Sequence, residues 1–366
     1  MFCCFLFTSP ALFVNIISRS YEIVETVDFV ISCHFITLAA RANCRTLLEL
    51  VQYLLFTMVR GRVLHFVFKV GDRNATAKFY RDVLGMKLNK KEIKVRSAKL
   101  REIQPYANRW SKTMVGYGPE ATHFAVELTY NYGITSYEMG NDFLGVTIKS
   151  RESIQRAKAQ GYPLSEENGV AVVESPGGYK FFLIDEPQPT DSDPIQKLTF
   201  ASSNIQQTLA YWNGLLGLDV YEKKPKSAIL AFGNNQVKLE FSVDHAKSYG
   251  RIAFAIPKAQ QPEIDRRVQE ANQKILTPLL DLDTPGKASV RVLILADPDG
   301  HEICFVDDEG FSQLSQTDPK GEELLTRYIK LDKFEVINLH NYNRCRRISI
   351  NWTKLLYLPI NIANVQ

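Results

Sequence analysis

The sequence predicts an α+β protein made of four short βαβββ modules, arranged as two tandem domains with curved mixed sheets. Two internal repeats and one linker support this fold class. Residues 64–88 align without gaps to residues 196–220, and residues 169–185 align to residues 290–306. Residues 187–194, rich in Pro and Asp, form a short exposed linker. Two copies of each repeat therefore indicate four modules in two pairs.

The first repeat predicts a strand followed by an amphipathic helix. Both copies begin with the alternation of polar and apolar residues that is typical of a half-buried strand. Asp72 and Asn204 stand at the turn, where a side-chain oxygen can accept from the first free N–H groups of a helix. Gly85 and Gly217 stand where each helix is expected to end.

The second repeat predicts a β-hairpin in each copy. Pro176 and Gly177 stand at the first turn, and the run from Pro298 to Gly300 stands at the second. Pro fixes one turn position and Gly supplies the backbone freedom that the turn needs. Residues 143–160 and 251–272 each predict a strand and a helix ahead of these hairpins, which completes the modules.

Composition places the chain among soluble globular proteins. Its 366 residues are 45% hydrophobic and 23% charged, which suits two or three domains. The formal net charge is +4 without a cluster of excess Lys and Arg, so we expect no nucleic-acid partner. Cys304 is the single cysteine between residues 58 and 334. The absence of an internal disulfide there favours a reducing compartment, the cytoplasm or a mitochondrion.

The two ends of the chain differ from its middle. Residues 1–57 contain apolar runs shorter than the ~20 residues that span a bilayer, so we expect no membrane insertion. We predict a non-domain extension from a gene model with Met58 as the natural start; the alternative is an unusual targeting or anchoring segment. Residues 335–366 hold six Asn and five Ile with no amphipathic period and are predicted to be a second extension. Residues 311–334 are predicted to form a helical tail.

Several strings carry a resemblance to a known family. LHFVFKVG, FYRDVLGMK, WSKTMVGYGPE and ILADPDGHEICFV together resemble the glyoxalase I or vicinal oxygen chelate superfamily, across about residues 58–334. The resemblance implies two domains, residues 58–186 and 195–310, in which paired modules wrap a curved sheet around a cleft. In active members four side chains, two from each module, hold a divalent metal that polarises vicinal oxygens of the substrate.

The resemblance places His65 and Glu127 at two metal positions of the first domain. Imidazole and carboxylate suit zinc or nickel, and Glu127 is also the candidate catalytic carboxylate. The other two positions fall on Phe143 and Phe182, which cannot coordinate. His123 cannot replace them, because it lies four residues before Glu127, about 13 Å along a strand. The metal site is therefore predicted to be incomplete.

A ligand-binding set is also implied by the resemblance. Lys69, Thr129 and Asn131 match positions that contact glutathione in glyoxalase I, with Lys69 in place of an Arg. Phe143 and Phe182 would line the same cleft with aromatic rings. The sequence thus favours a small thiol-containing or anionic ligand.

In the second domain the four metal positions fall on Lys197, Glu240, Arg251 and Cys304. Two cations would repel a divalent ion. Glu240 between Lys197 and Arg251 is predicted to form a buried ion-pair cluster, which is costly to break at one partner. Cys304 is either a reactive thiol with a pKa lowered by the cations, or a buried core thiol.

Two functions remain open. The favoured one is a protein with a degenerate metal cleft, little or no lactoylglutathione lyase activity and no cofactor, which binds a small ligand or a protein partner. The alternative is a lyase or isomerase that uses zinc or nickel in the first domain and acts on a glutathione adduct of a small carbonyl compound. Fold resemblance alone does not choose between them.

Overall fold

The structure is a computed structural model, and its described residues lie within the unit Val59–Gln366. Both predicted extensions, and nearly all of the predicted tail after residue 315, fall outside the described residues. No helix in the described part is both long and apolar enough to cross a membrane. The described residues are 59–94, 110–131, 134–233, 237–243, 250–282, 288–315, 323, 326 and 327.

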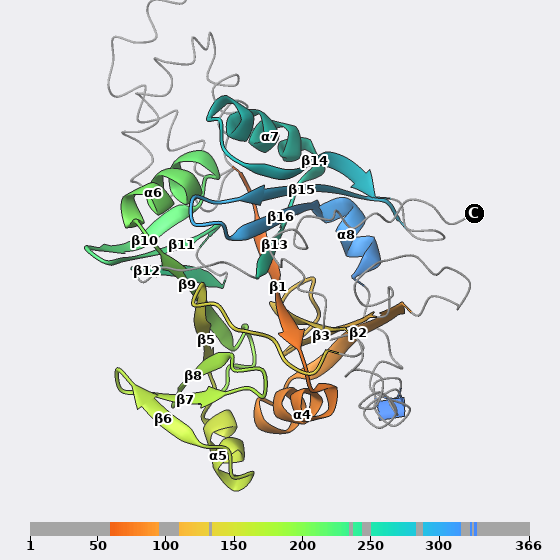
Figure 1. The fold of residues 1–366 in the computed structure, drawn as a ribbon, viewed down its shortest axis with the longest axis vertical. Coiled ribbons are helices and arrows are strands. Elements are labelled where there is room, and N and C mark those ends of the chain that lie inside the picture. The colour runs from red at the N-terminus through yellow and green to blue at the C-terminus, as the bar shows by residue number, and fades with distance from the viewer. Residues whose placement is uncertain are drawn as a thin grey trace, which may run out of the picture. The chain divides into compact units, whose positions relative to one another are not determined.

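Each of the four modules runs strand, helix and three strands, as the repeats predict (Figure 1). Module 1 contains β1 (Arg62–Val70), α4 (Arg73–Lys78), the π-helical turn η1 (Phe79–Val83), β2 (Lys87–Lys94), β3 (Trp110–Gly116) and β4 (Ala125–Asn131). Module 2 contains β5 (Phe143–Lys149), α5 (Arg151–Ala159), β6 (Leu164–Glu167), β7 (Val170–Glu174) and β8 (Lys180–Ile184).

Modules 3 and 4 repeat this order, and a short helix follows the last strand. Module 3 contains β9 (Ile195–Ser202), α6 (Ile205–Leu209), the π-helical turn η3 (Ala210–Leu215), β10 (Asp219–Lys224), β11 (Ser227–Ala231) and β12 (Lys238–Val243). Module 4 contains β13 (Arg251–Ile256), the 3₁₀ turn η4 (Lys258–Gln260), α7 (Gln261–Glu270), β14 (Ile275–Leu282), β15 (Val290–Ala296) and β16 (Glu302–Asp307). The final helix is α8 (Asp308–Leu314).

The predicted helix boundaries are confirmed in modules 1 and 3. The side chain of Asp72 accepts from the N–H of Ala75, and the side chain of Asn204 caps α6 in the same way. Gly85 and Gly217 adopt φ values of 75° and 83°, a left-handed conformation that a side chain would strain. The π-helical turns that end both helices were not predicted from the sequence.

The strands form two mixed eight-stranded sheets whose pairing differs from the prediction. Sheet A has the order β14-β15-β16-β13-β1-β4-β3-β2, so it joins modules 1 and 4. Sheet B has the order β10-β11-β12-β9-β5-β8-β7-β6, so it joins modules 2 and 3. In each sheet the first strands of two modules pair antiparallel, β1 with β13 and β5 with β9. The expectation that modules 1 and 2 share one curved sheet, and modules 3 and 4 the other, is wrong.

The helices nevertheless associate within the predicted domains. Arg156 of α5 donates to the carbonyl oxygens of Val83 and Leu84 at 2.9 Å, which ties module 2 to the helical end of module 1. In the other pair, α7 of module 4 contacts η3 of module 3. Helix packing therefore follows residues 58–186 and 195–310, while each sheet crosses between them.

Aromatic side chains fill the interior between the sheets and the helices. The rings of Phe66 in sheet A and Phe143 in sheet B stack with centroids 4.4 Å apart. Offset stacking and edge-to-face contacts of this kind add to the stabilisation that burial gives. The two sheets therefore share one hydrophobic core, and the opposite face of each sheet is free to carry polar groups.

Candidate functional site

The polar face of sheet A is set by strand alternation. On β1, Phe66 and Phe68 point into the core, so His65 and Lys69 lie on the opposite face. A bulge between Val63 and His65 shifts the register and brings Arg62 onto the same face as His65. We define the polar face of sheet A as His65, Lys69, Lys112, Glu127, Arg251, Glu302 and Cys304.

His65 and Glu127 lie side by side, as predicted, but both are engaged by other side chains. His65 Nδ1 lies 2.6 Å from Glu120 Oε1, and His65 Nε2 lies 3.3 Å from Glu127 Oε2. Lys112 Nζ lies 2.7 Å from the same oxygen of Glu127. The side chains of His65 and Glu127 are only 10% and 11% exposed. The result is a buried chain of four interacting groups.

The charge of Glu127 follows from its neighbours. Burial alone would raise the pKa of this carboxyl, but the ammonium of Lys112 and the imidazole of His65 outweigh burial and hold the pKa at about 2. Thr129 donates a weaker hydrogen bond to Glu127 at 3.3 Å, which acts in the same direction. Glu127 is therefore ionised at neutral pH and serves as the anion of this network.

Arg251 and Cys304 complete the polar face of sheet A, and here two predictions need correction. Arg251 pairs with Glu302, its Nε lying 2.7 Å from Oε2, and does not approach Glu240 in sheet B. The predicted three-residue cluster is wrong because the two strands belong to different sheets. Burial raises the pKa of the Cys304 thiol to about 11, more than Arg251 lowers it. Cys304 is thus a protonated, partly buried thiol, the second of the two alternatives.

Lys69 occupies the opposite end of β1 from Arg62. Burial lowers the pKa of its ammonium, Glu127 raises it, and the like charge of Arg251 lowers it again. Among the residues that the structure describes, no carboxylate lies within ion-pair distance of the Lys69 side chain. Lys69 is therefore a partly buried cation without an ion-pair partner among the described residues.

Two other residues of the predicted ligand set already form hydrogen bonds with neighbouring side chains. Thr129 bonds Glu127, and the side-chain amide of Asn131 donates to the hydroxyl of Tyr137 at 2.8 Å. His123 lies in the loop before β4, where its Nδ1 is 2.8 Å from the hydroxyl of Thr122. This agrees with its exclusion as a metal ligand.

The four side chains that sheet A brings to the metal positions do not fit a divalent metal. His65 and Glu127 come from module 1, and the partner module supplies Arg251 and Cys304 in place of a second His and carboxylate. Arg251 is a permanent cation, and a thiol with a pKa of about 11 is a poor ligand at neutral pH. The two remaining candidate ligands are already engaged, His65 by Glu120 and Glu127 by Lys112. These residues therefore form no metal site of the superfamily's kind.

The polar face of sheet B brings together Phe182, Lys197 and Glu240. Lys197 Nζ lies 2.6 Å from Glu240 Oε2, and their side chains are 27% and 23% exposed, so this pair is half-buried. Phe182 lies across Gly145, whose missing Cβ would meet the ring at 2.5 Å. Phe143 is not on this face: a bulge between Phe143 and Gly145 turns its ring into the core.

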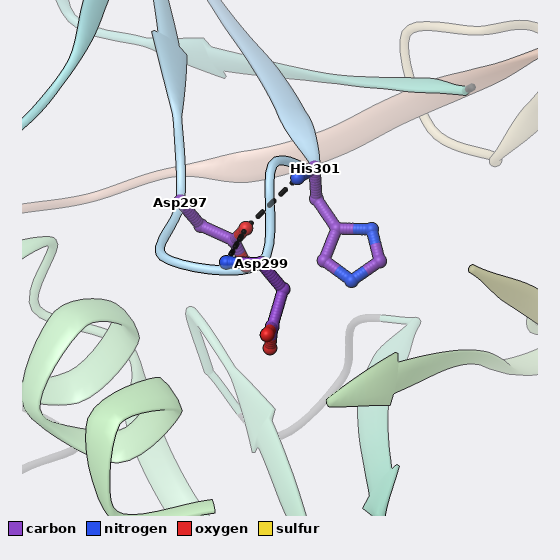
Figure 2. A group of neighbouring side chains, drawn as sticks. All are labelled: Asp297, Asp299 and His301. Atoms are coloured by element: carbon purple, nitrogen blue, oxygen red, sulfur yellow. Dashed lines mark hydrogen bonds between the residues drawn. The ribbon is translucent and has the colours of Figure 1, made fainter. Parts of the chain in front are cut away.

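A second cluster with metal-ligand chemistry, Asp297, Asp299 and His301, occupies the turn between β15 and β16 (Figure 2). One oxygen of Asp297 accepts from the N–H groups of Asp299 and His301, and the other accepts from Trp212 Nε1 at 3.0 Å. His301 Nε2 lies 2.7 Å from the carbonyl oxygen of Ala201. These contacts tie the hairpin of module 4 to module 3, so we interpret the cluster as a structural clasp.

Three functional neighbours were missed by sequence reasoning: Lys112, Glu120 and Glu302. Glu302 stands two residues before Cys304 on one strand, so alternation alone could have placed both on one face. Lys112 follows from alternation on β3 once its pairing with β4 is known. Glu120 lies in a loop, where no periodic signal exists. A hollow lined by Arg73, Tyr80, Val115 and Tyr130 lies on the helix side of module 1, away from these groups.

Comparison with known proteins supports the resemblance. The family described as "Glyoxalase domain-containing protein 4-like, C-terminal domain" matches residues 204–314, and the corresponding N-terminal family matches residues 145–185. "Glyoxalase domain-containing protein 4" of Rattus norvegicus is 50% identical over 75% of this chain and 95% of its own length. "Glyoxalase 1" of Caenorhabditis elegans is 38% identical over 75% and 98%. The crystal structure of glyoxalase I from Zea mays, 24% identical, shares the fold with a TM-score of 0.59 over 72% of this chain and 98% of that chain.

Proposed function

This chain belongs to the glyoxalase domain-containing protein 4 family, and on that premise we propose that it binds a small anionic ligand on the polar face of sheet A without a metal. We further propose that it has little or no lactoylglutathione lyase activity. The superfamily and the fold agree with the prediction from the sequence. The fold alone does not assign an activity, so the proposal rests on the side chains.

The observation that carries the proposal is the position of Lys69. Its side chain is partly buried on β1, has no carboxylate within ion-pair distance among the described residues, and lies near the like charge of Arg251 as well as the opposite charge of Glu127. A bound carboxylate would offset both the desolvation and the repulsion. Lys69 is therefore the first contact that we expect for an anion.

The second support is the accessibility of the neighbouring cations. Lys112 and Arg251 keep 28% and 31% of their side-chain surface exposed, although each is paired with a glutamate. Guanidinium and ammonium groups in such positions can bind a carboxylate of a ligand while they stay paired with their glutamates. Three cations on one face thus favour a ligand with one or two carboxylates, such as a thiol-containing peptide.

Isothermal titration calorimetry with reduced glutathione and with S-lactoylglutathione tests the proposal. We expect millimolar or tighter binding to the full chain, and a loss of about tenfold or more in affinity for Lys69→Met, since a charge-assisted bond is removed. Lys197→Met is the matched control, because Lys197 belongs to the polar face of sheet B. We expect it to bind like the parent chain.

Several results would overturn the proposal. One is no binding of either thiol peptide, and another is equal losses for Lys69→Met and Lys197→Met. A third is turnover of the methylglyoxal–glutathione adduct that is stimulated by zinc or nickel and abolished in Glu127→Gln. That result would favour the alternative function, a lyase or isomerase acting on a glutathione adduct of a small carbonyl compound. A protein partner in place of a small ligand remains a separate prediction.

A further inference from the structure

Helix α8 lies on the same face of sheet A as the ion network. On β13, Ile252, Phe254 and Ile256 point into the main core, whereas Ala253 and Ala255 point to the other face. Phe311 and Leu314 of α8 pack against the apolar cluster that contains these two alanines. The chain therefore turns back after its last strand and covers part of the polar face.

The contact of α8 reaches the predicted metal position itself. The ring of Phe311 lies 6.4 Å from the imidazole of His65, tilted by 37°. Around this contact the surface is apolar, and Cys304 is packed in the same cluster. The seat of α8 consists of Leu64, Ala253, Ala255, Val290, Val292 and Val306. At its His65 end the ion network of the polar face of sheet A therefore borders the apolar seat of α8.

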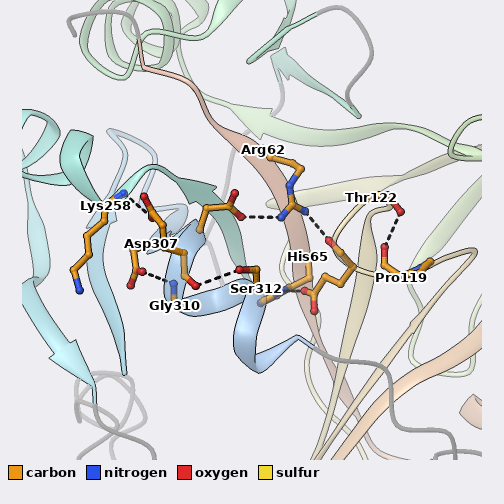
Figure 3. Close-up of polar contacts among 11 residues, drawn as sticks. Arg62, His65, Pro119, Thr122, Lys258, Asp307, Gly310 and Ser312 are labelled. Atoms are coloured by element: carbon orange, nitrogen blue, oxygen red, sulfur yellow. Dashed lines mark hydrogen bonds and ion pairs between the residues drawn. The ribbon is translucent and has the colours of Figure 1, made fainter. Parts of the chain in front are cut away.

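Arg62 holds α8 against the loop that carries Glu120 (Figure 3). One terminal nitrogen of Arg62 lies 3.1 Å from Asp308 Oδ1 in α8, and the other donates to the carbonyl oxygen of Glu120 at 2.6 Å. The side chain of Glu120 in turn bonds His65. A single guanidinium therefore connects α8 to the partner of His65.

The start of α8 is also seated closely on the sheet. Asp307 accepts from the N–H of Gly310 at 2.6 Å and caps the helix. Gly310 is buried, and a Cβ at this position would meet the carbonyl oxygen of Ser289 at 2.4 Å. Glu309 accepts from the N–H of Lys258 at 2.9 Å, which anchors α8 to module 4 as well.

We infer that α8 is an end wall of the ligand site on the polar face of sheet A, and that Phe311 determines how far a ligand extends from Lys69 toward His65. This inference rests on the proposed function, since it presumes an anion held at Lys69. Lys69 lies four residue steps after His65 on β1, a distance of about 13 Å along the strand. An extended tripeptide of about 10 Å fits this length. A long substituent on such a peptide would meet the ring of Phe311.

The cover that α8 provides can be measured without any ligand. We would treat the full chain with N-ethylmaleimide and follow the modification of Cys304 by peptide mass spectrometry, which separates it from the other cysteines. Phe311→Ala should raise the rate at Cys304 about fivefold or more, because the reactivity of a thiol depends on its exposure. Arg62→Gln, which leaves the apolar seat intact and removes the bridge between Asp308 and the carbonyl oxygen of Glu120, should raise it by a smaller factor. Phe182→Ala, an aromatic residue on the polar face of sheet B, is the matched control.

Ligand length is the second readout. We would compare glutathione, S-methylglutathione and S-hexylglutathione by calorimetry on the parent chain, Phe311→Ala and Phe182→Ala. The parent should bind the S-hexyl peptide more weakly than the S-methyl peptide. Phe311→Ala should reverse this order through a gain of about tenfold for the long chain, since it opens apolar surface for it. Phe182→Ala should keep the order of the parent.

The outcomes separate the two proposals. If none of the three peptides binds the parent chain, the proposed function fails, and the maleimide rates still report on α8. If glutathione binds but Phe311→Ala changes neither the length preference nor the rate at Cys304, the end wall is wrong. Circular dichroism of each variant distinguishes a local opening from global unfolding. A local opening leaves the spectrum unchanged while the rate of Cys304 modification rises. If Phe311→Ala unfolds, the test rests on Arg62→Gln. An unchanged rate of maleimide modification at Cys304 in that variant overturns the inference.

Discussion

The polar faces of the two sheets retain one carboxylate position but surround it differently. Glu127 lies beside Val67 on β1, and Glu240 lies beside the equivalent Thr199 on β9. In sheet A the carboxylate is 11% exposed, contacts both Lys112 and His65, and lies near α8. In sheet B it is 23% exposed and pairs with Lys197, which stands at the position equivalent to His65.

This difference teaches that burial, more than the type of residue, decides what such a position does. A glutamate that is nearly buried must keep its cation, because an unpaired charge in a medium of low polarity is costly. A half-exposed glutamate exchanges its partner for water at little cost. The two faces descend from one repeat, so they can be perturbed in parallel.

The largest effect is expected for Glu127→Gln. Removing the charge takes away the carboxylate that Lys112 and His65 share, which we expect to lower the free energy of unfolding by about 3 kcal/mol. This is the low end for a buried pair, because Lys112 reaches solvent. Urea denaturation followed by circular dichroism measures the change. A loss below about 1 kcal/mol would mean that the network is weaker than its distances imply.

The pH dependence of stability should differ between the parent chain and Glu127→Gln. The pKa of Glu127 is about 2 in the folded chain against an ordinary value of 4.5, so the unfolded state binds the proton more readily. The stability that this carboxylate contributes is present above about pH 5 and is lost as the pH falls toward 2. We expect the gap between the parent chain and Glu127→Gln to narrow by about 2 kcal/mol over that window. A gap that stays constant would contradict the depressed pKa.

In sheet B, a packing change should matter more than a charge change. A methyl group at Gly145 would lie 2.5 Å from the ring of Phe182 and 2.9 Å from the carbonyl oxygen of Lys180, at a φ of 150°. We expect Gly145→Ala to destabilise the chain by about 2 kcal/mol through strain and overpacking. Thermal unfolding measures it, with Gly161→Ala as a control that shares a positive φ but has open space around it. Equal losses would assign the whole effect to the backbone.

The smallest effect is expected for Glu240→Gln. Because the Lys197 pair is about a quarter exposed, we expect a loss of about 0.5 kcal/mol, which falls further in 1 M salt. Urea denaturation at low and high salt measures both values. A loss as large as that of Glu127→Gln would remove the distinction between the two faces.

The fold could be predicted from the sequence to the level of the modules. Alternation on β1, the caps Asp72 and Asn204, and the helix stops Gly85 and Gly217 are local features, and the structure confirms them. Which first strands pair is not a local property. The four first strands resemble one another, so the pattern does not show that β1 joins β13 rather than β5.

The candidate site was predicted in part for the same reason. The resemblance placed His65, Lys69 and Glu127 in one site, but their partners Arg251 and Cys304 come from a module that pairs nonlocally. Phe143 was placed wrongly because a single bulge reverses the face of every residue beyond it. Phe311 lies beyond the last strand, in a segment predicted only as a tail. Its contact with His65 depends on how α8 folds back, which no periodicity indicates.

The metal content of the purified full chain tests the central claim most directly. After incubation with zinc or nickel and desalting, mass spectrometry should find below about 0.1 equivalents bound through His65 and Glu127, because an Arg, a protonated thiol and two saturated donors form no metal site. Glu127→Gln should then hold the same amount as the parent chain. About one equivalent in the parent chain, lost in Glu127→Gln, would contradict the account and identify the polar face of sheet A as a metal centre.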